Sequence, residues 1–164
     1  MRRLCITLLC GLVAVPAAVA GVRAVGDGTL ELQSATGTFS VTGTRGTLWG
    51  QMDKGKIVAT DVVAGDGSVL VSGCTTKYSP SDAPNITICT GKNLHFRVKT
   101  GKYRLWMKGS GVDLTAVGVG TATLVASADP ALDDPGAYEL DGVKWIPVPE
   151  NPRTVTFGDS GTTP

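Results

Sequence analysis

The chain has 164 residues, the size of a single domain, and 22 of them are glycine while only 18% are charged. This balance favours short strands joined by tight turns and excludes long solvated helices. Fifteen basic residues against 14 acidic ones leave a formal charge of +1, so no bulk attraction to nucleic acid or to a membrane surface is implied. We therefore expect one domain without a nucleic-acid partner, in which charge effects are local.

Residues 1–20 have the pattern of a cleavable signal peptide. Two arginines precede an apolar run over 4–15, and Pro16 separates this run from the small residues at 18–20. We predict cleavage after Ala20, which leaves 13 basic and 14 acidic residues in a mature chain that is secreted or held at the cell envelope. A membrane anchor is the alternative, but roughly 18 apolar residues are needed to span a bilayer, and no second such run follows.

Alternation of apolar and polar residues with a period of two predicts eight short strands in the mature chain. They cover 29–33, 38–42, 56–63, 68–72, 94–98, 102–108, 112–117 and 121–126, and each is bounded by glycine, Asp-Gly or Thr-Gly. No segment has a helical period of useful length. Gly65, Asp66 and Gly67 are expected to turn one hairpin.

Cys74 and Cys89 are the cysteines that remain after cleavage, because Cys5 and Cys10 lie in the signal peptide. In an oxidising compartment we expect them to form a disulfide. The segment between them, TTKYSPSDAPNITI, contains two prolines and is predicted to be a loop with little strand character. Closing such a loop stabilises a fold by roughly 3 kcal/mol in the chain-entropy view. Without a Cys-x-x-Cys spacing, neither cysteine is expected to be catalytic.

Two segments resemble each other at a spacing of about 65 residues, within the ranges 29–72 and 93–126. When TLELQSATGTFSV is set above NLHFRVKTGKYRL, Leu30 meets Leu94 and Phe39 meets Tyr103. Two strand meanders that cover each other's apolar faces predict an all-β fold, either a two-sheet sandwich or a partly closed barrel. A short β-solenoid is the competing architecture, which the glycine spacing favours and the presence of only two copies disfavours.

The segment LHFRVKTGKYRLWMK predicts a basic surface. Alternation directs one set of side chains inward, namely Leu94, Phe96, Val98, Tyr103, Leu105 and Met107. The other set lies outward and contains no acid: His95, Arg97, Lys99, Lys102, Arg104, Trp106 and Lys108. A tryptophan among cations suits ion pairing and stacking with an anionic cell-wall polymer, or with an envelope protein. The alternatives are that an acidic tail covers this face, or that it is a solvated edge protected from aggregation.

The C-terminal segment from Ser127 onward holds seven acids against two bases. Asp141 and Gly142 are the strongest two-residue hairpin signal in the chain. We expect this segment to wrap the edge of a domain covering 21–158, with Trp145 and Ile146 packed inward and 159–164 frayed.

Catalysis and metal binding have weaker signals. His95 is the single histidine, so every histidine-based mechanism would have to pass through it. The alternative function is a secreted hydrolase using paired carboxylates, such as Asp53 with Asp61 or Asp113, although no motif surrounds them. We expect a non-catalytic domain without a cofactor.

A cluster of acids lies in a proline-flanked segment and is a weak candidate for calcium. Its members are Asp129, Asp133 and Asp134. Their spacing is wrong for an EF-hand, and aspartates beside proline and glycine are what turns require for backbone reasons, so turn chemistry is favoured over a metal site.

Residues 94–124 carry an aromatic-Arg strand, a glycine turn, a Tyr-Arg-Leu strand and the motif GxGVxLTAxGxG, and 137–150 add a Tyr-x-Leu-x-Gly-x-x-Trp hairpin. In this pattern the chain resembles a group of exported, β-rich actinobacterial proteins of uncharacterised function. The resemblance covers roughly two thirds of the mature chain. It implies an exported β domain and no substrate, cofactor or catalytic residue, and the segment 74–89 departs from the pattern.

Overall fold

The computed structural model describes residues 24–127 and 135–159, and over these ranges the chain is all-β. The strands are β1 (Gly28–Asp61), β2 (Val69–Tyr78), β3 (Ile86–Val98), β4 (Tyr103–Ala126), β5 (Ala137–Leu140), β6 (Ile146–Pro147) and β7 (Arg153–Phe157). In this described part there is no helix long and apolar enough to cross a membrane. The predicted signal peptide and the candidate ligands Asp129, Asp133 and Asp134 lie outside the described residues.

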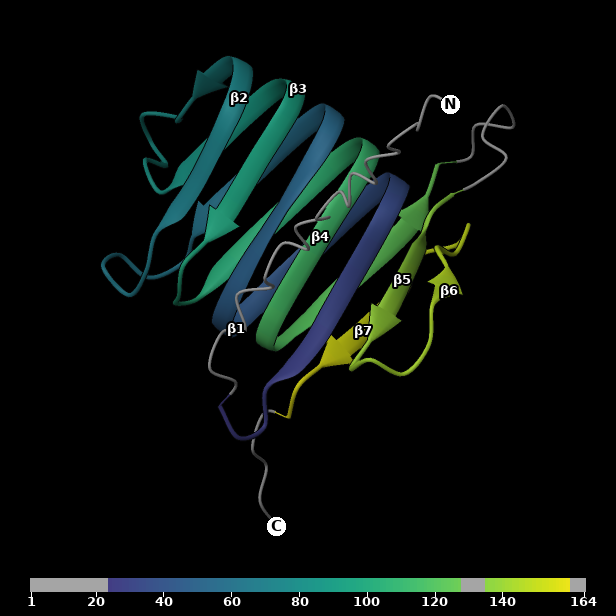
Figure 1. Ribbon diagram of the computed structural model, residues 1–164. Coiled ribbons are helices and arrows are strands. Elements are labelled where there is room, and N and C mark those ends of the chain that lie inside the picture. Colours follow the sequence, from purple (N-terminus) through teal and green to yellow (C-terminus); the bar gives the residue numbers. More distant parts are fainter. Residues whose placement is uncertain (1–23, 128–134, 160–164) are drawn as a thin grey trace, which may run out of the picture.

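One antiparallel sheet contains all seven strands, in the order β2-β3-β1-β4-β7, with β5 on β1 and β6 on β5. β1 and β4 pair twice, because Ala116 lies opposite both Leu30 and Leu48. Two passes of β1 therefore flank the same stretch of β4, so the paired strands coil on themselves (Figure 1). The sheet does not close into a barrel, since β2 and β7 end it on opposite sides.

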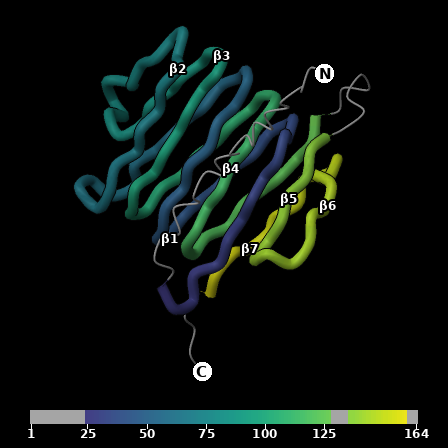
Figure 2. The backbone as a smooth tube through the Cα atoms, in the orientation of Figure 1, coloured from purple at the N-terminus to yellow at the C-terminus, as the bar shows by residue number. Residues whose placement is uncertain are grey.

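Coiling produces two layers that face each other, as the backbone trace shows (Figure 2). Layer A contains residues 29–33, 47–52, 94–98 and 112–117, together with β5. Layer B contains residues 38–43, 57–61, 86–90, 103–108 and 121–126, together with β7. The arrangement is that of a sandwich made from one continuous sheet, which agrees with the predicted all-β fold class.

Glycines mark the places where a strand passes from one layer to the other. Gly28, Gly37, Gly46 and Gly55 follow one another at nine-residue steps in β1. Gly46 pairs with Gly118 and has a φ of 125°, and a Cβ there would lie 2.1 Å from the carbonyl oxygen of Val117. Strands approach so closely at these points that a side chain does not fit.

The predicted strand boundaries are wrong for this reason. The glycines bend a strand without ending it, so the predicted strands 29–33 and 38–42 and most of 56–63 merge into β1. Similarly, 102–108, 112–117 and 121–126 merge into β4. The two segments aligned as a repeat also differ at one point, because Gly37 lies within β1 whereas Gly101 lies in the turn between β3 and β4.

The core lies between the two layers. The predicted inward set is confirmed, since Leu94, Phe96, Val98, Tyr103, Leu105 and Met107 are each at most 3% exposed. Burying a side chain of this size stabilises the fold by about 1.5–3 kcal/mol. The Tyr103 hydroxyl has no hydrogen-bond partner among the described residues, and burial raises the pKa of this phenol. Gly43 leaves the space that the Tyr103 ring occupies.

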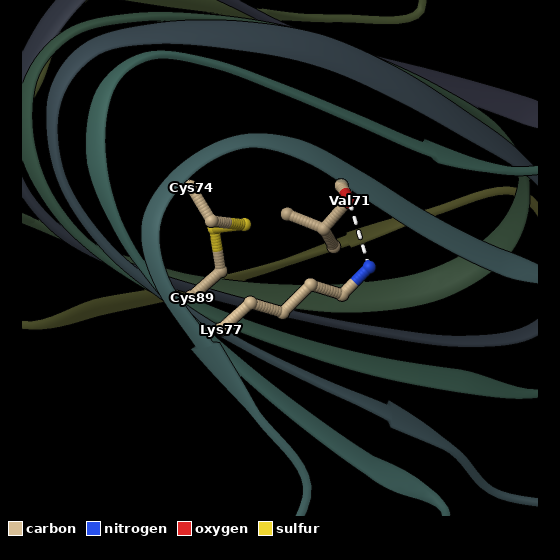
Figure 3. The surroundings of a disulfide bond; sticks show 4 residues. All are labelled: Val71, Cys74, Lys77 and Cys89. Carbon is tan, nitrogen blue, oxygen red and sulfur yellow. Dashed lines mark hydrogen bonds between the residues drawn. A yellow bond between two sulfur atoms is a disulfide. The ribbon is translucent and has the colours of Figure 1, made fainter.

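The predicted disulfide joins β2 to β3, with 5.4 Å between the Cα atoms of Cys74 and Cys89. Close to it, Lys77 Nζ donates a hydrogen bond of 3.1 Å to the carbonyl oxygen of Val71 (Figure 3). The prediction that a loop fills most of the segment between the cysteines is wrong. β2 continues to Tyr78 and β3 begins at Ile86, so the bridge ties two paired strands together.

The C-terminal segment adds strands to the rim of the sheet. The predicted turn is present, since Asp141 and Gly142 have φ values of 54° and 72° and Val143 N donates to Leu140 O at 3.1 Å. The expected inward packing of Trp145 and Ile146 is wrong, because they are 40% and 37% exposed. β6 is the outermost strand, beyond the core, and the side chains buried from the described part of this segment are Tyr138, Val148, Val155 and Phe157 instead.

Candidate binding grooves

The predicted basic surface is divided between two sides of the molecule. His95 and Arg97 lie on the outer face of layer A, whereas Arg104, Trp106 and Lys108 lie on layer B. The chain crosses between the layers at the turn that contains Lys99 and Lys102. Because both strands direct their apolar side chains into one core, their outward side chains face opposite directions.

One groove runs along the edge where the strands bend between the layers, and we call it the lysine groove. Its volume is about 920 Å³. Its floor contains the glycines of four adjacent strand passes: Gly37, Gly55, Gly91 and Gly109. Its charged lining residues are Lys54, Lys56, Lys92 and Lys108. Trp106 and several threonines and serines complete the walls. Because the glycines have no side chains, the space above this floor and between the lining side chains stays open.

The lysines of this groove form two cross-strand pairs. Lys54 lies opposite Lys92 on the neighbouring strand, and Lys56 lies opposite Lys108. Like charges in directly opposite positions destabilise a sheet. None of the four side chains has a hydrogen bond or ion pair with a described residue, and no acid lines the groove. The groove therefore concentrates positive charge that nothing in the described part of the chain neutralises.

Trp106 lies beside the lysines on a face rich in hydroxyl groups. Its register partners are Ser40 and Val58, and it is partly exposed. The strand passes beyond it carry outward hydroxyls at Thr38, Thr42, Thr121, Thr123, Thr154 and Thr156. β7 does not cover Trp106, because it pairs with residues 120–124 and two strand passes lie between it and the strand of Trp106.

Of the seven residues predicted from the sequence, Trp106 and Lys108 line the lysine groove and Arg104 is the next outward residue on the same strand. Lys54, Lys56 and Lys92 were not predicted. The nine-residue glycine spacing is the signal that could have identified them, because glycines in register bring together the residues beside them.

The residues considered for catalysis do not assemble. His95 lies opposite Ser72 and Gln51, and Asp113 is one strand further away, where it accepts hydrogen bonds from Ser34 N at 2.8 Å and Gln51 Nε2 at 3.0 Å. Gln51 thus occupies the place where an acid would have to orient the imidazole.

The carboxylates considered for a hydrolase lie at three different places in the fold. Asp61 ends β1 in layer B opposite Tyr103, whereas Asp113 lies in layer A. Asp53 lies at the bend between the layers, over Gly111. Among the described residues no group of three potential ligands could hold a metal ion.

Comparison of the chain with known protein families, with curated proteins and with solved structures returned no match. The resemblance to exported actinobacterial proteins therefore stays a prediction.

Proposed function

We propose that this chain is an exported, non-catalytic β domain that binds an anionic polymer of the cell envelope through the lysine groove. The observation that carries the proposal is the pairing of four lysines, Lys54 with Lys92 and Lys56 with Lys108, in a groove that no acid among the described residues lines. A bound polyanion would remove the repulsion between these side chains and occupy the space above the glycines.

The geometry favours a polymer over a small anion. The groove crosses several neighbouring strand passes, from Thr76 on β2 to Ser127 beyond β4, and strands are about 4.8 Å apart. A chain with repeating phosphate or carboxylate groups can therefore contact lysines on successive strands. One exposed ion pair contributes at most about 1 kcal/mol, so several are required for useful affinity. Such binding weakens as salt is added, because the pairs are exposed.

Export is supported by two features. The first 20 residues have the pattern of a signal peptide, and Cys74 and Cys89 form a disulfide, a bond typical of oxidising compartments. A surface polymer is then the anionic ligand that an exported domain meets first.

The proposal is tested by measuring the affinity of the mature chain for linear inorganic polyphosphate and for polygalacturonate, with neutral dextran as a control polymer. A variant with Lys54, Lys56, Lys92 and Lys108 changed to glutamine is expected to lose at least about tenfold in affinity, a change of 1.4 kcal/mol. The matched variant changes four exposed cations outside the groove, Lys99, Lys102, Lys144 and Arg153, to glutamine and should keep most of the affinity. Equal losses in both variants, or no binding by the native chain, would contradict the proposal.

A further inference from the structure

A second groove lies on the outer face of layer A and shares no residue with the lysine groove. Its volume is about 960 Å³, near the upper end of the range of about 300–1,000 Å³ that ligand sites have. Trp49 from β1 and Trp145 from the segment between β5 and β6 both line it, and they are 41% and 40% exposed. Two large aromatic side chains this exposed in one groove mark a binding surface. We call it the two-tryptophan groove.

Two parallel rows of side chains form the floor of this groove. One row crosses the strands through Leu70, Arg97, Trp49, Thr115 and Glu31, which lie opposite one another in register. The other row lies two residues along each strand and contains Ser72, His95, Gln51 and Asp113. The row that contains Leu70 and Trp49 together with Arg97, Thr115 and Glu31 thus runs beside a row that is polar throughout.

The polar row is held in place at its Asp113 end. The Asp113 carboxylate accepts a hydrogen bond from the backbone N–H of Ser34 at 2.8 Å and another from Gln51 Nε2 at 3.0 Å. Gln51 and Asp113 line the groove and have oxygen atoms that can accept further hydrogen bonds, while Arg97 and His95 have N–H groups that can donate. Groups held in this way lose little freedom when a ligand binds.

The charges of this groove exclude a polyanion as the ligand. Glu31 and Asp113 offset Arg97 and Lys77, and the Lys77 ammonium already donates to the carbonyl oxygen of Val71 at 3.1 Å. A ligand that suits this surface is uncharged, has flat apolar faces for the indole rings, and has many hydroxyl groups that both donate and accept. Those are the properties of a sugar ring.

We propose that the two-tryptophan groove binds an uncharged oligosaccharide, independently of the lysine groove. Its sugar rings would pack on Trp49 and Trp145, and their hydroxyls would bond to Gln51, Asp113 and Arg97. A proline-rich peptide also packs on aromatic side chains, but proline has no backbone N–H to donate, so such a peptide would leave the acceptor oxygens of Gln51 and Asp113 without partners.

Calorimetric titration of the mature chain with neutral linear hexasaccharides of glucose, mannose, xylose and N-acetylglucosamine tests this proposal. At least one is expected to bind, and Trp49→Ala and Trp145→Ala should each weaken binding about tenfold. Trp145 lies in a surface segment, so its variant keeps the test informative if Trp49→Ala unfolds the chain. Trp106→Ala, in the lysine groove, should bind the sugar as the native chain does.

Salt separates this test from that of the proposed function. Sugar binding should not change when salt is raised to about 0.5 M, whereas polyphosphate binding should fall steeply. The proposal is overturned if no hexasaccharide binds, if the Trp49→Ala and Trp145→Ala variants both bind as the native chain does, or if a polyproline peptide binds at Trp145 and the sugars do not. None of these results bears on the lysine groove.

Discussion

The lysine groove and the two-tryptophan groove are built largely from the same four strands, yet their chemistry differs. β1, β2, β3 and β4 supply residues to both. In the lysine groove every charged residue is a cation without a side-chain partner among the described residues. The two-tryptophan groove contains the acids Glu31 and Asp113 as well as cations, and Asp113 is held by two hydrogen bonds. In a coiled sheet one long strand thus presents side chains to two surfaces, and residues only a few positions apart on that strand can line different grooves.

The largest expected effect is a loss of stability of the whole sheet, on which both grooves depend. Gly46→Ala would place a Cβ 2.1 Å from the Val117 carbonyl oxygen, at a residue whose φ is 125°. We expect the free energy of unfolding in urea to fall by about 3 kcal/mol or more, because neither the backbone conformation nor the space admits a side chain.

Gly65→Ala is the control, since nothing lies within 4 Å of a Cβ built at that position and only its φ of 87° is unfavourable. The control should lose about 1 kcal/mol. Equal losses for the two variants would show that close strand approach does not explain the bends.

Removing the disulfide comes next. The Cys74→Ala, Cys89→Ala double variant lacks a bridge that spans 15 residues of sequence, which predicts a loss of about 3 kcal/mol in urea unfolding. Because β2 lines the lysine groove with Thr76 and the two-tryptophan groove with Leu70, both ligands should bind more weakly. A variant that weakened one ligand alone would show that the two halves of β2 are independent.

High pH tests the burial of Tyr103 in the core that lies between the two layers. Burial raises the pKa of Tyr103 above its ordinary value, so the stability linked to this phenol is complete below the unfolded-state pKa of about 10 and is lost as the pH rises past it. Tyr103→Phe should reduce this loss between pH 8 and about pH 11 in urea unfolding. At neutral pH it should be up to about 1 kcal/mol more stable, since the buried hydroxyl has no partner among the described residues. An unchanged loss at high pH in the variant would contradict this assignment.

The smallest effect concerns Trp106, which lines the lysine groove. Trp106→Ala should weaken polyphosphate binding about threefold, as expected for the loss of one stacking or cation–π contact of under 1 kcal/mol. Measured by the same titration, the loss should be well below that of the four-lysine variant. A loss as large as that of the four-lysine variant would make the aromatic ring, and not the charge, the main determinant.

Much of the fold could be predicted from local patterns. Alternation identified the inward set from Leu94 to Met107, cysteine count and context identified the disulfide, and the Asp141-Gly142 signal identified a turn. The inward set and the turn depend on residues that are near one another in sequence. The disulfide could be predicted because no other cysteine remains in the mature chain to pair with Cys74 or Cys89.

Local patterns could not predict that the basic surface is divided between the outer faces of the two layers. Alternation states which side chains leave the core, but it does not state which outer surface they reach, and a turn at 99–102 sends Arg97 and Arg104 to opposite sides. Lys54 and Lys92 meet only through strand register, 38 positions apart in the chain. Glycine was interpreted as a strand end because it commonly is one, whereas here the close approach of neighbouring strands requires it inside β1 and β4.

The central claim is that a polyanion binds along the glycine bends, and residue-resolved NMR tests it most directly. Amide shifts of the mature chain are recorded as linear polyphosphate is added. We predict that the largest changes fall at Lys54–Lys56, at 90–92 and at 106–110, with little change at His95, Arg97, Lys99 and Lys102. Changes concentrated on those last four residues, or spread evenly over all exposed cations, would contradict it.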